Sequence, residues 1–277
     1  APFHDMFDPA DVPDPVRRGT AADEAALHPF VAGALTVVPS PADELDQRQL
    51  RATYYGMIAE VDAQVGRLLD GLDERGLRDD TIVVLTSDHG EQLGDHWLIE
   101  KLGFFDQSYR IPLIIRWPGM SGRPGRVVDA FTENVDITPT LLDLVGAPPS
   151  PFCDGASLRP FLDEDLEGTD EPDGWRDAVH FEFDFREPGS SVIEEIFGLR
   201  QDQCAIAVRR DRHRKYVQFC GDLPPLYFDL DRDPGELEDR SLDPEVAADL
   251  LECTRDLLRM RMEHTDPRLA NTRATGL

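Results

Sequence analysis

TIVVLTSDHG, residues 81–90, is the stretch of this sequence that decides the fold. Its first six residues are β-branched or apolar without alternation, which is typical of a strand buried on both faces. Asp88 and His89 follow directly, in a loop that ends at Gly90. Ligands of open α/β sheets bind beyond the carboxyl ends of the strands, so this loop is the first candidate for a functional site.

An amphipathic helix is predicted before this strand. Apolar side chains recur at helical spacing on one face from about residue 47 to residue 72. Gly76 ends the helical region, and a short turn leads into the strand. Helix, turn and buried strand together indicate an α/β unit. Residues 111–117 supply a second apolar strand, and a further helix is expected through Leu144, with Thr138 as its N-cap.

The pattern changes beyond an acidic linker at residues 164–173. Short alternating stretches there predict a small antiparallel sheet, and a final helix follows at about residues 244–262. We therefore expect two domains. Residues 1–163 belong to an α/β core with a mixed sheet flanked by helices, and residues 164–277 form a small C-terminal antiparallel β subdomain with a terminal helix.

The composition is that of an acidic globular protein. The chain has 28 basic and 55 acidic residues and a net charge of −27, which argues against nucleic acid or an anionic membrane as a partner. No apolar run approaches the roughly 20 residues of a membrane span. The four cysteines show no CxxC spacing and are expected to be reduced, which favours a cytoplasmic location.

The Asp88-His89 pair has the chemistry of half a metal site. A carboxylate oxygen beside an imidazole nitrogen favours a transition ion, because Ca²⁺ prefers a shell of oxygen ligands. Mn²⁺ is therefore favoured over Ca²⁺, and Fe²⁺ and Zn²⁺ stay open. Two ligands do not complete a site, so others must come from elsewhere. An isolated Asp-His-Gly tripeptide is more often a surface turn, and the surrounding motifs decide between the two readings.

Those motifs follow one another in a fixed order. They are SDHGEQLGDH (87–96), Lys101, FDQSYRIPLII (105–115), FTENVDITPTLLD (131–143), CDGASLRPFL (153–162), HFEFDFR (180–186) and PPLYFDLDRDP (224–234). The whole string resembles the sulfatase branch of the alkaline phosphatase superfamily, and within it the bacterial phosphonate monoester hydrolases. The resemblance covers nearly the whole chain.

The resemblance implies an alkaline-phosphatase-like α/β fold and a metal-dependent hydrolase. Its substrates would be small-molecule esters, namely phosphonate monoesters and phosphodiesters, attacked by sulfatase-like chemistry. A homo-oligomer is consistent with the family analogy alone. A choline-sulfatase-like or aryl sulfatase is the alternative within the enzymes.

The resemblance also implies roles for particular residues. Asp88 and His89 match two ligands of the single catalytic metal ion, and His89 stands where many arylsulfatases have an asparagine with calcium. Lys101 matches a lysine that contacts the transferring group or the nucleophile, where a fixed cation stabilises growing charge; otherwise it is a solvated surface lysine. His96 is a candidate site residue that either lines the site or supports it from behind. Arg110 is expected to pair with buried carboxylates and so position the loop.

One family feature is not in this sequence. Family members carry an N-terminal metal-binding aspartate and a Cys-x-Pro-Ser-Arg motif, whose cysteine becomes the formylglycine nucleophile. None of the four cysteines here is followed by x-Pro-Ser-Arg. We therefore expect the formylglycine in an N-terminal segment ahead of Ala1, and we expect the chain alone to be inactive. The competing interpretation is a non-catalytic, degenerate fragment that kept half of the site. The coding sequence upstream of Ala1 distinguishes the two.

Overall fold

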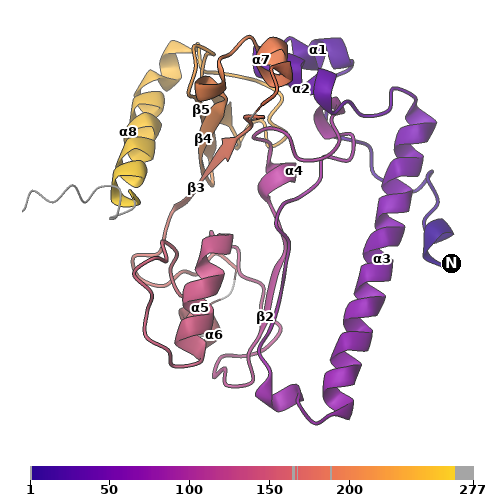
Figure 1. Ribbon diagram of the computed structural model, residues 1–277, viewed down its shortest axis with the longest axis vertical. Helices are drawn as coiled ribbons and strands as arrows, with labels where there is room; N and C mark the ends of the chain where they lie inside the picture. Colours follow the sequence, from indigo (N-terminus) through magenta and orange to yellow (C-terminus); the bar gives the residue numbers. More distant parts are fainter. Residues whose placement is uncertain (1, 164–165, 167, 188, 266–277) are drawn as a thin grey trace, which may run out of the picture. The chain divides into compact units, whose positions relative to one another are not determined.

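The computed structural model describes residues 2–163, 166, 168–187 and 189–265. The chain forms two compact units, Ala1–Met120 and Ser121–Leu277, and Figure 1 draws the elements of both. All four candidate site residues lie in the first unit. The compact units divide before residue 163, where the sequence places a domain boundary, and that boundary stays a prediction. Part of the expected linker at 164–173 lies outside the described residues.

The first unit is organised by one long helix and a pair of strands. Its elements are η1 (Phe3–Asp5), α1 (Ala21–Ala25), α2 (Pro29–Val37), α3 (Glu44–Glu74), η2 (Arg78–Asp80), β1 (Val83–Thr86), η3 (Asp95–Trp97), α4 (Asp106–Tyr109) and β2 (Leu113–Arg116). The predicted long helix is confirmed as α3. It begins after Asp43, whose carboxylate accepts hydrogen bonds from the backbone N–H groups of Leu45 and Asp46 at 2.9 and 3.2 Å.

β1 and β2 pair in antiparallel fashion, with Leu85 opposite Ile114. Both predicted strands are therefore present, and the α/β class is confirmed. The burial expected for residues 81–86 is wrong, because the side chains of β1 are at most partly buried. Among the described residues, β1 has β2 as its one strand neighbour, so its far edge and much of its surface are left uncovered. The apolar stripe of α3 is exposed as well, with Val61 and Leu68 at 61% and 65%.

The buried core of the first unit lies beside α2. Phe30 of this helix packs against Phe104 with ring centroids 5.9 Å apart, and Phe104 packs against Phe105 at 4.4 Å. Leu98 is fully buried and forms an isolated β-bridge with Pro39. The segment that connects His89 to Lys101 is thus anchored in the core, although its two ends are accessible.

The second unit contains the four-stranded sheet that the alternating pattern predicts. Its elements are η4 (Asn134–Asp136), α5 (Ile137–Leu144), α6 (Arg159–Asp163), β3 (Ala178–Asp184), α7 (Val192–Phe197), η5 (Gln201–Gln203), β4 (Ala205–Asp211), β5 (Arg214–Phe219), β6 (Leu226–Asp229), η6 (Pro244–Val246) and α8 (Ala247–Glu263). The strands pair antiparallel in chain order, β3-β4-β5-β6, which confirms the small antiparallel sheet.

The start of α5 corrects one detail. The helix begins at Ile137, directly after η4, so Thr138 lies inside it and is not the N-cap. The buried Asp136 carboxylate fixes this start, because it accepts hydrogen bonds from the N–H groups of Glu133 and Ala156, each at 2.8 Å. A local carboxylate with long-range partners therefore outweighs the Thr-Pro signal.

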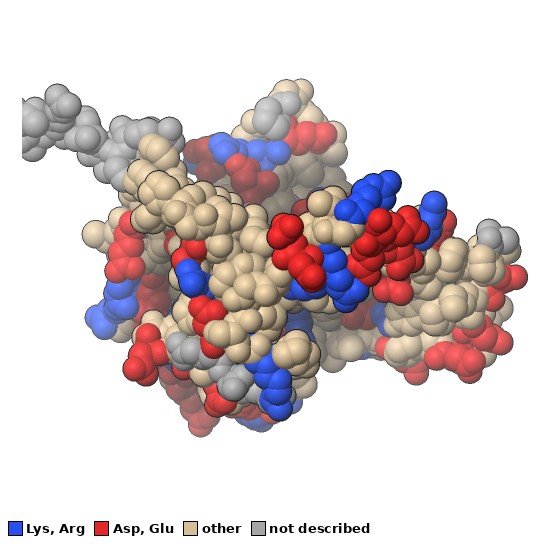
Figure 2. All heavy atoms as spheres, turned by 90° about the horizontal axis from the view of Figure 1, so that it is seen from below, with Lys and Arg blue, Asp and Glu red and all other residues tan. Residues whose placement is uncertain are grey.

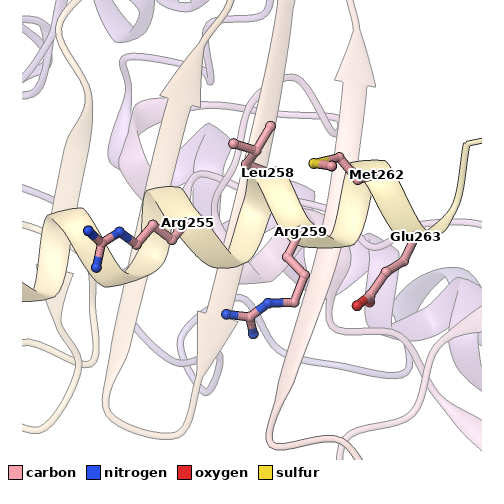
Figure 3. Close-up of a pocket in the computed structure, with 5 residues that line it drawn as sticks. All are labelled: Arg255, Leu258, Arg259, Met262 and Glu263. Carbon is pink, nitrogen blue, oxygen red and sulfur yellow. The ribbon is translucent and has the colours of Figure 1, made fainter.

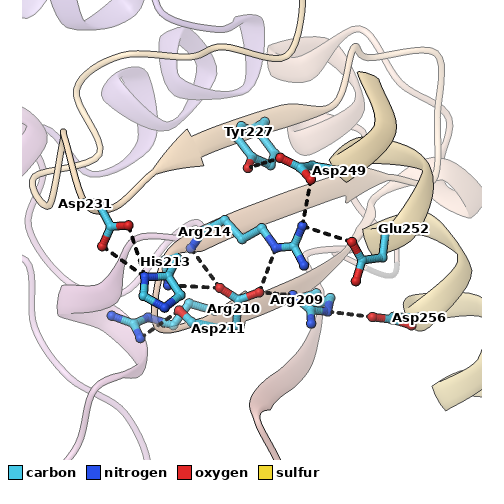
Figure 4. Close-up of polar contacts among 10 residues, drawn as sticks. All are labelled: Arg209, Arg210, Asp211, His213, Arg214, Tyr227, Asp231, Asp249, Glu252 and Asp256. Atoms are coloured by element: carbon cyan, nitrogen blue, oxygen red, sulfur yellow. Dashed lines mark hydrogen bonds and ion pairs between the residues drawn. The ribbon is translucent and has the colours of Figure 1, made fainter. Parts of the chain in front are cut away.

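The final helix, α8, is held to the sheet by charged pairs. Figure 4 shows Arg209 of β4 reaching Asp256 at 3.1 Å and Arg214 of β5 reaching Asp249 at 3.0 Å. Cys253, which lies between Asp249 and Asp256 in the sequence, is fully buried. A pocket on α8 is lined by the apolar side chains of Leu258 and Met262 and the charged side chains of Arg255, Arg259 and Glu263 (Figure 3).

Charges of both signs lie close together on the surface. On the face drawn in Figure 2, acidic and basic side chains stand beside one another, and no large area has one sign alone. Many of the basic side chains thus have acidic neighbours, as Arg214 has in Asp249 and Glu252. Within the described part of the chain, every helix is too short or too polar to cross a bilayer.

Candidate active site

Asp88 and His89 lie in the loop that leaves β1, as the sequence predicts. The backbone N–H of His89 donates a hydrogen bond to Asp88 Oδ1 at 3.0 Å, and Ser87 Oγ donates to the carbonyl of His89 at 2.7 Å. This tight turn places Asp88 Oδ2 3.6 Å from His89 Nε2. The two side chains are 84% and 35% exposed, so both are accessible to a ligand.

The tautomer of His89 follows from its second ring nitrogen. Nδ1 lies 2.8 Å from the carbonyl oxygen of Gly90. A carbonyl only accepts, so Nδ1 carries the proton and the lone pair of the neutral ring is on Nε2. That lone pair is on the nitrogen nearest Asp88 Oδ2. Metal–ligand bonds of roughly 2.0–2.2 Å would allow both atoms to reach one ion. The pair therefore fits half of a divalent metal site.

The other half is not formed by this chain's described residues. Among them, no group of three or more His, Cys, Asp or Glu side chains comes together to hold an ion. Transition ions in proteins take more ligands than two. The additional ligands remain a prediction, and so does the identity of the ion.

Gly90 holds the loop against the next helix. Its N–H donates to the carbonyl of Ser108 at 2.8 Å. A Cβ at position 90 would lie 2.0 Å from the carbonyl oxygen of Gln107, well inside van der Waals contact. Only glycine therefore permits this approach. The close contact holds the loop of Asp88 and His89 next to α4.

Lys101 acts electrostatically on Asp88. Desolvation is the largest single influence on this carboxyl and raises its pKa. The positive charge that His89 carries when its ring is protonated, the hydrogen bond from the His89 N–H and the charge of Lys101 outweigh desolvation, so the pKa of Asp88 is lowered. The Lys101 side chain is exposed. The structure thus gathers a carboxylate, an imidazole and an ammonium group on one accessible loop.

His96 lies behind this loop and not on its exposed side. Its ring is fully buried, with Nδ1 2.8 Å from Glu24 Oε1, and it stacks on Phe105 with the ring centroids 3.5 Å apart. Nε2 has no hydrogen-bond partner among the described residues. This geometry favours a supporting position over the lining of the site. A part for His96 in the reaction stays a prediction.

The arginine that positions the loop is not the expected one. Arg110 is exposed, and among the described residues no carboxylate forms an ion pair with it. Arg51 of α3 makes the contacts instead: it donates to the carbonyl of Leu93 at 2.8 Å and forms a buried ion pair with Asp95. Sequence reasoning missed Arg51, although a charged residue on the same helix face as Tyr54 was a signal that it had a buried partner.

Comparison with known proteins places these features in a family. The chain matches the sulfatase family over residues 3–147 and the family of the C-terminal part of N-sulphoglucosamine sulphohydrolase over residues 94–263. It is 39% identical over 287 aligned residues to the multifunctional alkaline phosphatase superfamily protein PehA of Trinickia caryophylli. It is 34% identical over 228 aligned residues to a choline-sulfatase of Rhizobium meliloti.

A solved structure has the same fold. The phosphonate monoester hydrolase of Agrobacterium radiobacter superimposes with a TM-score of 0.90 at 44% sequence identity. The alignment covers 99% of this chain and 56% of that enzyme. Coverage of PehA is 99% and 55%, and coverage of the choline-sulfatase is 80% and 39%. The chain thus spans about half the length of its most similar relatives.

Proposed function

Because the chain belongs to the sulfatase family, we propose that the natural protein that carries it hydrolyses phosphonate monoesters and phosphodiesters. The observation that carries the proposal is the Asp88-His89 pair, whose Oδ2 and Nε2 atoms lie 3.6 Å apart with Nε2 free to bind a cation. Sulfatases generally use a metal ion and a formylglycine. None of the four cysteines of this chain is followed by x-Pro-Ser-Arg, and we assign none of its residues the role of the nucleophile.

The residues of this chain have separate tasks in such a reaction. Asp88 and His89 would hold one divalent ion, for which Mn²⁺ fits the mixed oxygen and nitrogen ligands better than Ca²⁺. When bound, this ion supplies positive charge to the nucleophile and the transferring group. Lys101 adds an ammonium group, which stabilises the negative charge that grows on the transferring oxygens. Ser87 and Gly90 hold the loop that orients the pair.

The number of charges selects the substrate class. One divalent ion and one lysine neutralise a singly charged transferring group, such as a phosphonate monoester or a phosphodiester. A phosphate monoester is a dianion and asks for more positive charge than these groups provide. The chain has a net charge of −27, which disfavours a dianion further. We therefore propose monoanionic esters as the substrates.

Hydrolysis of 4-nitrophenyl phenylphosphonate tests this proposal. The natural protein should release 4-nitrophenol in a metal-dependent reaction, and His89→Ala should abolish most of the turnover by removing a ligand. His213→Ala is the matched control, because His213 is an exposed histidine of the second unit whose Nδ1 lies 3.0 Å from Asp231. Full metal-dependent turnover by the His89→Ala protein would contradict the assignment of the site.

A second candidate substrate class is sulfate esters. The choline-sulfatase relative favours it, and a sulfate monoester carries the same single charge as a phosphonate monoester. The two candidates are separated by kcat/KM for 4-nitrophenyl sulfate and 4-nitrophenyl phenylphosphonate, which share a leaving group. We expect the phosphonate to be the better substrate and the sulfate to be a side activity.

A further inference from the structure

The segment between the metal pair and Lys101 is strained. Leu93, His96, Trp97 and Glu100 all have positive φ angles, of 51°, 52°, 60° and 63°. Residues with side chains rarely adopt this conformation, and it persists only where the surroundings hold it. We call residues 93–100 the connecting segment, because it joins the loop of His89 to Lys101.

Arg51 is the first group that holds the connecting segment. From α3, its guanidinium donates to the carbonyl oxygens of Leu93 and Pro13, at 2.8 and 3.2 Å. It also pairs with Asp95, whose Oδ1 accepts a further hydrogen bond from the N–H of Val16 at 3.0 Å. The Arg51 side chain is only 9% exposed. A single planar cation therefore ties two positions of the segment to the long helix.

Glu24 is the second group. Its fully buried carboxylate makes two contacts. Oε1 lies 2.8 Å from Nδ1 of His96, and Oε2 accepts a hydrogen bond from the N–H of Arg18 at 2.8 Å. Phe105 stacks on the His96 ring and covers one of its faces. The backbone closes the base of the segment, because the N–H of Gln92 donates to the carbonyl of Glu100 at 2.9 Å.

We propose that Arg51 and Glu24 are positioning residues that fix Lys101 relative to Asp88 and His89. Lys101 follows Glu100 directly, so the strained conformation of the connecting segment sets the position of its backbone and the direction in which its side chain leaves the loop. Neither residue touches the exposed side of the loop, and both act through the segment. The proposal rests on the proposed function only for the consequence of moving Lys101, since the placement itself is a matter of structure.

The two lysines of the chain allow a direct test. In the natural protein grown with lysine labelled with ¹³C at the ε carbon, the side-chain signal that Lys101→Arg removes is that of Lys101, and the signal that Lys215→Arg removes is that of Lys215. Arg51→Ala should move the Lys101 signal and leave that of Lys215, which lies in the second unit, in place. Arg48→Ala is the matched control: it is on the same helix and pairs with Asp14 and Glu44, away from the connecting segment.

A Lys101 signal that stays in place in folded Arg51→Ala protein would overturn the proposal. If this variant does not fold, Asp95→Asn replaces it, because it keeps the size of the side chain and removes only its charge. Glu24→Gln provides an independent test from the other side of the segment. In each case the Lys215 signal reports whether the second unit is intact.

Activity gives the second readout. A misplaced catalytic cation should lower kcat by roughly 10- to 100-fold on 4-nitrophenyl phenylphosphonate, with the metal content unchanged. Arg51→Ala is expected to act in this way, and Arg48→Ala is not. If Lys101 moves in the spectrum but Lys101→Ala leaves hydrolysis unchanged, the positioning stands and the proposed function of Lys101 fails. A loss of metal equal to the loss of kcat in Arg51→Ala would contradict the proposal.

Discussion

Lys101 and His89 bring different chemistry to one loop, so their removal should have different consequences. Lys101→Ala should lower turnover by roughly 100- to 1,000-fold, because a transition-state charge contact is lost, and should leave the metal in place. His89→Ala should lose metal and activity together. Elemental analysis beside initial rates separates these outcomes. Equal metal loss in the two variants would contradict the division of roles.

Gly90 gives a test of the loop itself. Gly90→Ala would bring a Cβ to 2.0 Å from the carbonyl oxygen of Gln107, so the loop must shift. We expect a loss of unfolding free energy of about 1–3 kcal/mol, together with weaker metal binding. Gly66→Ala is the control, because nothing lies within 4 Å of a Cβ at this position of α3, and it should stabilise by about 0.4–1 kcal/mol. Urea unfolding measures both, and equal stability of the two variants would contradict this account.

The sequence predicts the site as far as its residues are neighbours in the chain. Asp88 and His89 are adjacent, so their meeting needed only a turn. Arg51 lies 42 residues before Leu93, and Glu24 lies 72 residues before His96. Contacts at such separation depend on how the helices pack. The sequence therefore pointed to Arg110, which is near the loop in the chain and exposed in the structure.

Elements with a long or regular pattern were predictable, and short ones were not. The period of α3 and the alternation of the strands of the second unit identify them directly. α6 and α7 have five and six residues, too few to show a helical period, and both were missed. The apolar run of residues 81–86 identifies a strand, but burial depends on what covers it, which a local pattern does not contain.

Lys215 of β5 shows how a charge can be part of a strand core. Its side chain is fully buried and pairs with Glu236, which is 1% exposed. Lys215→Met alone should cost about 3–5 kcal/mol of unfolding free energy, because it leaves a buried carboxylate without its cation. The double variant with Glu236→Leu should recover most of this loss. Urea unfolding of the single and double variants tests the coupling, and additive losses would contradict it.

His180 of β3 should make the second unit sensitive to acid. Burial is the main cause of its lowered pKa, and the charge of Arg209 adds to the effect. Between this lowered pKa and the ordinary value of about 6.5, the unfolded chain binds the proton more readily. The free energy of unfolding therefore falls as the pH drops below about 6.5. His180→Gln should flatten this slope. Urea unfolding at about pH 7.5 and about pH 5.5 measures it, and an unchanged slope in His180→Gln would contradict the assignment.

At the scale of the whole molecule, the order of the motifs was more informative than any single one. SDHG alone is a common turn, whereas the ordered string identifies a family, and the match over residues 3–147 confirms it. The fold agrees with that family, because the chain superimposes on the Agrobacterium radiobacter enzyme with a TM-score of 0.90. Further ligands for the proposed metal site did not follow, because the described residues bring together no group of three or more His, Cys, Asp or Glu side chains.

The charge of the substrate is the most direct test of the central claim. The measurement is kcat/KM of the natural protein for three 4-nitrophenyl esters: phenylphosphonate, a phosphodiester and phosphate. One divalent ion and Lys101 match a single negative charge, so the phosphonate monoester and the phosphodiester should react with the higher kcat/KM. A phosphate monoester that reacts faster than both would contradict the account and indicate a phosphatase.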